Sequence, residues 1–420
     1  MLDLQAQLDD LRRRMADAVS RPSLFQPPPL PREEFLEQCI PGEVIESSLG
    51  THYQTTRCWE HWRRHGCITI SELNELPVNL LDGISQNELP SSPPESWAFL
   101  DTETTGLAGG SGTCAFLIGI GRITARGFEV RQFFMRDYQE EPAMLHSIEQ
   151  QLAGVELLIT YNGKSFDLPL LETRYRMSRR ASPFSRIPHL DLLHGARRLW
   201  RLRFSSCKLT DLEAEVLGYL REGDVPGHLI PLLYFDFLRT RAAMRLVPVF
   251  LHNALDILTL ACLTAVVPWA FRDATQLPIR HPAEMVSLGR WLRAAGQLEQ
   301  ALALFRRAAD GLDRDDLLFR TLWDTALLEK KLGRPQQAIT LFHDLALVPN
   351  PHRLSALEEL AKHYEHRERN PSLALEFAEQ AMQLGAGEPA LRRRQRLAKK
   401  SGSLRSSAPG TLLPQQLLPR

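Results

Sequence analysis

The chain has 420 residues, of which 44% are hydrophobic and 24% are charged, and 50 basic residues balance 50 acidic ones. This composition excludes a chain that is disordered throughout, a collagen and a coiled-coil rod. The zero formal net charge argues against a general polyanion-coating protein, although it permits a local basic patch. The six cysteines are scattered along the chain, which suits a reducing compartment better than a disulfide framework.

The N-terminus does not resemble a secretory signal, because Met1 to Arg13 carries charges of both signs and no apolar core. The most apolar stretch, Leu258 to Phe271, is shorter than the roughly 20 residues that a membrane helix needs. We therefore expect a cytoplasmic protein with no membrane partner. Residues 1–40 predict a short helix followed by a proline-rich segment, and residues 41–96 an N-terminal extension that ends in a linker.

Residues 97–270 have the pattern of an α/β domain. Three apolar runs predict successive strands, and these are Trp97–Leu100, Cys114–Ile120 and Phe128–Met135. Helices and strands then alternate as far as His189–Leu193, after which helices dominate. This order predicts a mixed sheet flanked by helices.

Residues 281–386 have a purely helical period that repeats. Alanines of the repeat stand at 301, 338 and 374, so the spacing is 37 and then 36 residues. The pattern resembles tetratricopeptide repeats, whose period is about 34, and a generic helical bundle is the alternative. We expect each repeat to pack on its neighbours rather than on the α/β domain.

Residues 387–420 predict a basic disordered tail, since no acid occurs after position 389.

Asp101 and Glu103 are the first chemical signal, because residues i and i+2 of a strand share a face. Two adjacent carboxylates repel each other unless a cation lies between them, and oxygen ligands favour Mg²⁺ or Mn²⁺. Two solvated acids in a turn are the alternative. Asp167 follows a buried strand and could merely cap the next helix. His252 and Asp256 share a helix face, although His252 alone would be interpreted as a core histidine.

Together these acids resemble, in order and setting, the DnaQ-like DEDD exonucleases of the ribonuclease H-like superfamily. The resemblance covers about residues 97–270 and includes the runs YNGKSFDLPLL, HLDLLH and KLTDLEAEVLG. With trailing tetratricopeptide-like repeats, the chain looks most similar to bacterial YprB-like proteins.

The resemblance implies phosphodiester hydrolysis with two Mg²⁺ or Mn²⁺ ions. Asp101, Glu103 and Asp256 would hold the first ion, and Asp101 and Asp167 the second. His252 precedes Asp256 by four residues, where the family has tyrosine at that spacing or histidine one residue earlier. It would orient or deprotonate water. Asp191 also lies on a nearby strand, but in the family this acid is not a ligand.

Nine arginines and one acid lie between positions 174 and 203, interleaved with aromatic residues. Arginine forks fit phosphate and aromatic rings stack on unpaired bases, although a solvated charged face is the equal alternative. The predicted nucleic-acid contacts are Asn162, Lys164, Arg174, Arg197, Arg201 and Lys208. The sequence thus predicts a 3′–5′ exonuclease on single-stranded DNA or RNA, with a protein partner for the repeats. A non-catalytic nucleic-acid-binding scaffold and a ribonuclease H-type endonuclease are the alternatives.

Overall fold

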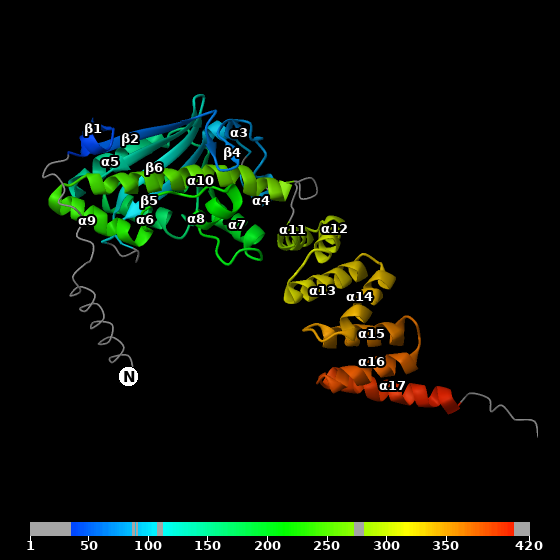
Figure 1. The fold of residues 1–420 in the computed structure, drawn as a ribbon. Coiled ribbons are helices and arrows are strands. Elements are labelled where there is room, and N and C mark those ends of the chain that lie inside the picture. The colour runs from blue at the N-terminus through cyan, green and yellow to red at the C-terminus, as the bar shows by residue number, and fades with distance from the viewer. Residues whose placement is uncertain (1–34, 86–88, 90, 107–111, 273–280, 407–420) are drawn as a thin grey trace, which may run out of the picture.

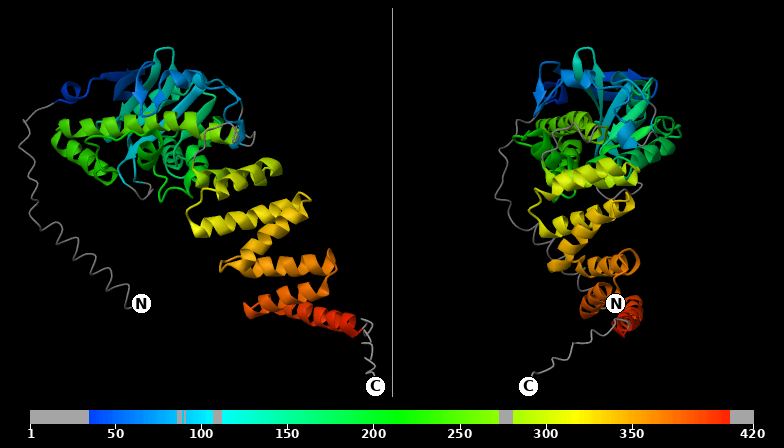
Figure 2. Two further views of the ribbon diagram at one scale, coloured as in Figure 1. Left: turned by 45° about the vertical axis from the view of Figure 1, so that its right-hand side comes forward. Right: turned by 90° about the vertical axis from the view of Figure 1, so that its right-hand side faces the viewer.

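The computed structural model describes residues 35–85, 89, 91–106, 112–272 and 281–406. An α/β domain, coloured blue to green, precedes a helical array, coloured yellow to red, that extends away from it (Figures 1 and 2). The predicted fold class, a mixed sheet flanked by helices and followed by helices alone, is confirmed. The predicted helix of residues 1–20 and the prolines up to residue 34 lie outside the described residues.

Seven strands form the main sheet, in the order β1-β2-β7-β6-β5-β8-β9. Their bounds are β1 (Glu43–Ser47), β2 (Gly50–Glu60), β5 (Trp97–Thr104), β6 (Ala115–Thr124), β7 (Gly127–Phe134), β8 (Leu157–Thr160) and β9 (His189–Asp191). Strands β8 and β9 run parallel to β5, and the other pairs are antiparallel. A separate small hairpin joins β3 (Arg64–His65) to β4 (Ile68–Thr69).

The prediction that residues 41–96 form an extension apart from the domain is wrong for its first half. Strand β2 pairs with β7 along its length, from Tyr53 opposite Phe134 to Glu60 opposite Gly127, and β1 pairs with β2. Without β2, β7 would be an open sheet edge with unpaired backbone groups. The extension is therefore part of the α/β domain's sheet.

Helices cover both faces of the sheet. Their bounds are α2 (Leu36–Cys39), α3 (Ser71–Asn74), α4 (Asp82–Ser85), α5 (Glu141–Gln151), α6 (Asp167–Met177), α7 (Leu192–Trp200), α8 (Leu209–Leu212), α9 (Ile230–Thr240) and α10 (Val247–Arg272). Residues of β5 alternate between the two faces. Trp97 and Phe99 pack in one core with α7 and α10, whereas Ala98 and Leu100 pack in a second core with α5 and α6.

Helix α10 is the long helix that crosses the sheet (Figure 1). The apolar stretch expected to be too short for a membrane is the second half of this 26-residue helix. The span Met244–Phe271 is long and apolar enough to cross a membrane, but 83% of its most apolar window is buried inside the protein, as in a core helix. Gly119 permits this close packing, because a Cβ there would lie 2.2 Å from Ile257 Cδ1.

The array consists of antiparallel helices stacked in sequence. Their bounds are α11 (Pro282–Ala294), α12 (Leu298–Ala309), α13 (Asp315–Lys331), α14 (Pro335–Leu347), α15 (Arg353–His366), α16 (Pro371–Gln383) and α17 (Glu388–Ser406). Small buried residues lie where the repeat predicted close helix packing, as at Ala301, Ala338 and Ala374. The helical array is confirmed, and its tetratricopeptide class stays a prediction.

Two expectations about the array are wrong. The first hairpin packs on the α/β domain, since α11 contacts α7 and the ring of Trp291 lies edge-on to Phe271 at 5.0 Å. The tail, expected to be disordered, forms helix α17 up to Ser406, and residues 407–420 lie outside the described residues. Helix α17 is ordered because Glu365 on α15 pairs with Arg396, and its apolar side packs on α16.

Candidate active site

Four carboxylates come together from three elements that are distant in sequence. Asp101 and Glu103 lie near the end of β5, Asp167 is the first residue of α6, and Asp256 lies on α10. Each acid affects others electrostatically. The charges of Asp256 and Asp167 raise the pKa values of both Asp101 and Glu103. The structure thus brings the four predicted acids into one cluster.

Burial is the main cause of the raised pKa values in this cluster. It raises the pKa of Asp101 and of Glu103 well above the ordinary carboxyl range, and the neighbouring acids add to the effect. Burial also raises the pKa of Asp167 to about 6, although the hydroxyl of Thr102, 2.5 Å from its Oδ1, opposes that shift. A half-buried cluster of like charges is unfavourable in the ionised state, which is the condition that a bound cation relieves.

Asp101 is held by an amide that the sequence analysis did not identify. Asn253 on α10 donates its Nδ2 to Asp101 Oδ2 at 2.8 Å, and Gln132 on β7 donates to Asn253 Oδ1 at the same distance. Gly119, opposite Asp101 in the β5–β6 register, leaves space for this amide, since a Cβ there would lie 2.4 Å from Asn253 Oδ1. This chain of hydrogen bonds fixes the Asp101 carboxylate against the sheet.

Arg221 is a second residue that the sequence analysis missed. Its buried guanidinium donates to Asp256 Oδ1 at 2.6 Å and to Glu213 Oε2 at 2.6 Å, and Asp224 Oδ2 lies 3.4 Å away. Burial lowers the pKa of Arg221, but the Asp256 and Glu213 carboxylates more than offset this, so the pKa is raised overall. Arg221 is therefore a permanent cation at the edge of the acid cluster.

Glu213 connects this arginine to the N-terminal hairpin. His65 on β3 is buried, and its Nε2 lies 3.0 Å from Glu213 Oε1. Thr259 on α10 also donates to Glu213. The β3–β4 hairpin, which the sequence assigned to an extension, thus supports the position of Asp256 through Glu213 and Arg221.

His252 lies beside Asp256 as its spacing predicted, with Nε2 at 3.5 Å from Asp256 Oδ2. Its other ring nitrogen, Nδ1, is 2.7 Å from Asp224 Oδ1. Because a carboxylate only accepts, this contact places a proton on Nδ1. Nε2 then donates toward Asp256 in the charged ring and accepts a proton in the neutral ring. Asp224 is thus the residue that orients His252, and its position in an irregular segment gave no sequence signal.

Asp191, which the resemblance leaves out of the metal ligands, stabilises the turn after β8. Its carboxylate accepts from the backbone N–H groups of Asn162 at 2.8 Å and Lys164 at 3.1 Å. Asn162 has a positive φ of 66°, so the turn after β8 is tight and leads directly to Asp167. The Lys164 side chain is exposed on this turn, and Lys208 is exposed just before α8. Three of the predicted nucleic-acid contacts therefore lie near the acids or on exposed loops.

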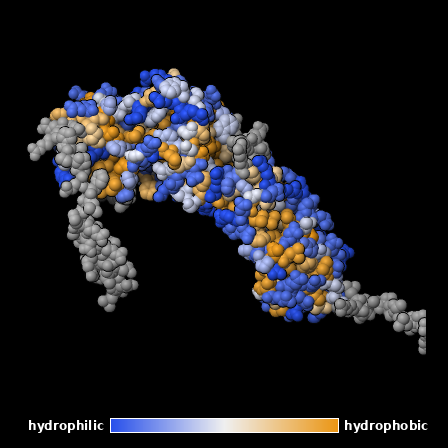
Figure 3. Space-filling model, in the orientation of Figure 1, coloured by the Kyte–Doolittle hydropathy of each residue, from blue (hydrophilic) through white to orange (hydrophobic). Residues whose placement is uncertain are grey.

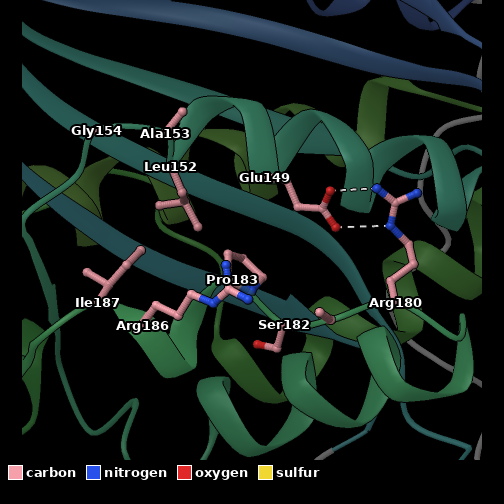
Figure 4. A pocket seen from close by; sticks show the side chains of 10 residues that line it. Glu149, Leu152, Ala153, Gly154, Arg180, Ser182, Pro183, Arg186 and Ile187 are labelled. Atoms are coloured by element: carbon pink, nitrogen blue, oxygen red, sulfur yellow. Dashed lines mark hydrogen bonds and ion pairs between the residues drawn. The ribbon is translucent and has the colours of Figure 1, made fainter.

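The arginine-rich run separates into two groups. Three of its arginines form ion pairs within the protein, and these are Arg174 with Glu141, Arg180 with Glu149 and Arg203 with Glu284. Figure 4 shows the two-pronged pair of Arg180 and Glu149 in a surface pocket. Arg174, a predicted nucleic-acid contact, donates two hydrogen bonds to Glu141, and its contact with nucleic acid stays a prediction. Arg197 on α7 and Arg201 directly after it are exposed, and they line a cleft shared with α11.

The donor set fits Mg²⁺ or Mn²⁺, since all four clustered ligands would be carboxylates. Across the described ranges, however, no group of three or more His, Cys, Asp or Glu side chains already stands at the spacing of a formed metal site. The Arg221 guanidinium lies on Asp256 instead. If Asp256 binds an ion, its carboxylate must therefore contact both the Arg221 guanidinium and that ion.

A family model and a sequence relative match this chain. A model of the RNase H superfamily matches residues 98–267. The chain is 34% identical over 324 residues to the uncharacterized protein YprB of Bacillus subtilis strain 168, covering 76% of this chain and 77% of YprB. It also aligns with a solved family B DNA polymerase from the hyperthermophilic archaeon Pyrobaculum calidifontis. That match has 14% identity and a TM-score of 0.29, and it covers 52% of this chain and 30% of the polymerase.

Proposed function

Because the chain belongs to the RNase H superfamily, together with YprB, we propose that it is a metal-dependent nuclease that shortens single-stranded DNA or RNA from the 3′ end. Membership of this superfamily supports nuclease-type phosphodiester hydrolysis in general. The gathering of four carboxylates from β5, α6 and α10 is the observation that carries the finer proposal, because a platform that only binds nucleic acid gains nothing from it.

Asp101, Glu103 and Asp256 would hold one Mg²⁺ or Mn²⁺ ion, and Asp101 and Asp167 a second. Bound ions of this kind activate water and stabilise the leaving oxygen. Asn253 keeps the Asp101 carboxylate in place, and Thr102 does the same for Asp167. These hydrogen bonds limit the movement of each carboxylate, which favours a defined geometry at the scissile phosphate.

His252 acts as the acceptor of the water proton in this proposal. Its Nδ1–H is held by Asp224, so Nε2 is free of that proton and points to the side of Asp256. The Asp224 carboxylate also stabilises the imidazolium that forms when Nε2 takes a proton. The histidine thereby performs the role that the family assigns to a tyrosine at this spacing or to a histidine one position earlier.

The surroundings of the acids suit an unpaired strand. Phe166, next to Asp167, is a large apolar residue that is 60% exposed, and an exposed ring beside the cleavage centre can stack on a terminal base. Lys164 on the same turn supplies a charge for a phosphate. An unpaired terminal base can turn its face onto Phe166 without moving a second strand, so we propose single strands as the favoured substrate.

An end-labelled strand tests the activity and separates the remaining alternatives. With Mg²⁺ or Mn²⁺, and not with EDTA, we expect stepwise shortening of a 5′-labelled oligonucleotide. Internal fragments would favour a ribonuclease H-type endonuclease, and binding without cleavage would favour a scaffold. DNA and RNA versions of one sequence identify the sugar preference.

We further propose a cytoplasmic location and a protein partner for the later helices of the array, since stacked helical repeats present extended binding surfaces.

A further inference from the structure

A basic cleft lies between the α/β domain and the helical array. Helices α7 and α11 enclose a space of about 410 Å³, and its charged and aromatic lining consists of His194, Arg197, Arg198, Arg201, Arg290 and Trp291. We call it the α7–α11 cleft. Among its lining residues in the described part of the chain, none is a carboxylate. In the orientation of Figure 3, the surface where the two parts meet is largely hydrophilic.

The arginines of this cleft have few anionic partners. Arg197 and Arg198 on α7 and Arg201 at its C-cap are exposed, and over the described ranges no ion pair involves any of them. Arg290 is 3.7 Å from Asp324, a buried acid that also pairs with Arg293 and Arg320. One carboxylate thus serves three guanidiniums. The cleft therefore retains a positive charge that the fold itself does not neutralise.

The guanidiniums of the cleft also act on one another. Burial lowers the pKa of Arg290, Asp324 raises it, and the charges of Arg320, Arg293 and Arg201 lower it. Arg201 comes from the α/β domain and Arg290 from the array, so the two helices bring like charges together across their contact. Like charges held at a contact cost stability unless an anion binds between them.

Trp291 gives a second indication of a ligand. Its side chain is only 8% exposed, and within the described chain its buried indole Nε1–H has no hydrogen-bond partner. A buried donor without an acceptor is costly, and such groups are rare in folded proteins. Trp291 also lines the cleft, and a ligand oxygen would reach this buried donor only if the indole ring turned toward the cleft.

We propose that the α7–α11 cleft binds the phosphodiester backbone of the single-stranded substrate, so that the array takes part in holding the strand. This inference rests on the proposed nuclease function. Asp191, which holds the turn that leads to Asp167, is the N-cap of α7, and Arg201 is its C-cap, about 15 Å further along the helix axis. The cleft is therefore coupled to the cleavage centre through one rigid helix. Arginine forks bind phosphate oxygens in pairs.

Binding of a fluorescein-labelled single-stranded oligonucleotide to the full-length Asp101→Asn protein tests the inference, measured by anisotropy at several salt concentrations. In the added double variant Arg197→Ala/Arg201→Ala we expect Kd to rise by about 10-fold or more. The slope of log K against log salt should become shallower by about 1.4, which is two phosphate contacts at about 0.7 each. A second pair, Arg201→Ala/Arg290→Ala, should give a similar change and tests the contribution of the array.

The matched control is Arg63→Ala/Arg126→Ala. These two arginines line another cleft, which contains Glu60, and Arg126 lies at the turn after β6, away from the Asp101 end of β5. We expect less than a twofold change in Kd for the control. Melting curves of all variants, including Arg197→Lys/Arg201→Lys, which should retain most binding, identify any loss that comes from unfolding.

The outcomes separate this inference from the proposed function. If wild type shortens the oligonucleotide but neither arginine pair changes Kd or the salt slope, the cleft is not a strand site and the nuclease proposal stands. Binding that depends on the arginines without any cleavage by wild type supports the cleft and contradicts the nuclease proposal. A thermal shift with inorganic phosphate that the arginine pair removes, without oligonucleotide binding, would overturn the strand site in favour of a small phosphate ligand.

Discussion

The acid cluster and the α7–α11 cleft carry opposite excesses of charge. Asp101, Glu103 and Asp167 gather with Asp256 beside one buried guanidinium, that of Arg221. In the cleft, guanidiniums gather instead, and Asp324 is shared among several of them. Each excess costs stability in the isolated protein. Each would be relieved by a ligand of the opposite sign, a divalent cation in the first case and a phosphate in the second.

Elsewhere in the array, acids are also shared between cations. Glu365 pairs with Arg393 and Arg396, and Glu359 pairs with Lys330 and Lys362. The zero net charge of the whole chain therefore hides local imbalances. The cleft differs from these pairs because, over the described ranges, no ion pair involves Arg197, Arg198 or Arg201. Local imbalance among buried or half-buried groups, more than total charge, indicates where a ligand is expected.

Removing the array should have the largest effect, because α11 belongs to both the cleft and the core. A chain ending at Leu277, a position outside the described residues, would lose Leu288, Trp291 and their partners, and a buried large apolar side chain contributes about 1.5–3 kcal/mol. We expect loss of folding or a much lower melting temperature. A chain ending at Gly333 retains α11 to α13 and should melt close to wild type. The first chain cleaving at full rate would show the two parts to be independent.

The strands and acids that the sequence predicted depend on residues close to one another in the chain. The alternation along Trp97–Thr104 and the four-residue spacing of His252 and Asp256 follow from strand and helix geometry alone, so they gave both the elements and the side that the acids face. Asp167 was predictable as well, because a buried strand and a new helix enclose it.

What the sequence did not predict depends on partners distant in the chain. Strand β2 joins the sheet by pairing with β7, and the register of that pair has no local signal. Helix α17 has a basic composition typical of disorder, but its main anionic partner, Glu365, lies on α15. Arg221 lies in an irregular segment without a period, and its role is visible only when Glu213, Asp224 and Asp256 surround it.

Changing the acids should have the next largest effect. Asp101→Asn or Asp256→Asn should reduce metal-dependent cleavage by about 10³-fold or more, the scale expected when one member of a catalytic unit is lost. Because Asp101→Asn removes one charge from the buried cluster, the metal-free variant should be at least as stable as wild type. Asp344→Asn, an exposed acid on α14, is the matched control and should cleave normally. Undiminished cleavage by both site variants would contradict the assignment of this cluster.

Arg221→Met tests whether the acid cluster depends on its resident cation. The change leaves Glu213 buried beside His65, and it also leaves Asp256 without its nearest positive charge. Breaking a buried pair by removing one partner costs about 3–5 kcal/mol, whereas exposed pairs contribute about 0–1 kcal/mol. Urea unfolding should therefore separate Arg221→Met from Arg392→Met, whose exposed pair with Glu388 serves as the control. If the double variant Arg221→Met/Glu213→Met is no more stable than Arg221→Met alone, the unpaired Glu213 is not the cause of the lower free energy of unfolding.

Metal linkage should give the smallest effect and the most direct test of the acid cluster. An ion that binds only the folded state stabilises it by RT ln(1 + [L]/Kd), which is about 1.4 kcal/mol at ten times Kd. Mg²⁺ or Mn²⁺ should therefore raise the melting temperature of wild type and of Asp344→Asn equally. The shift should be smaller in Asp101→Asn, because Asp101 is the residue expected to contact both ions and its carboxylate is fixed by Asn253. Asn253→Ala should give an intermediate shift, since the ligand remains but is less well held. Equal shifts in all four proteins would mean that the ion binds away from β5, and the excess of negative charge there would then have no cation to explain it.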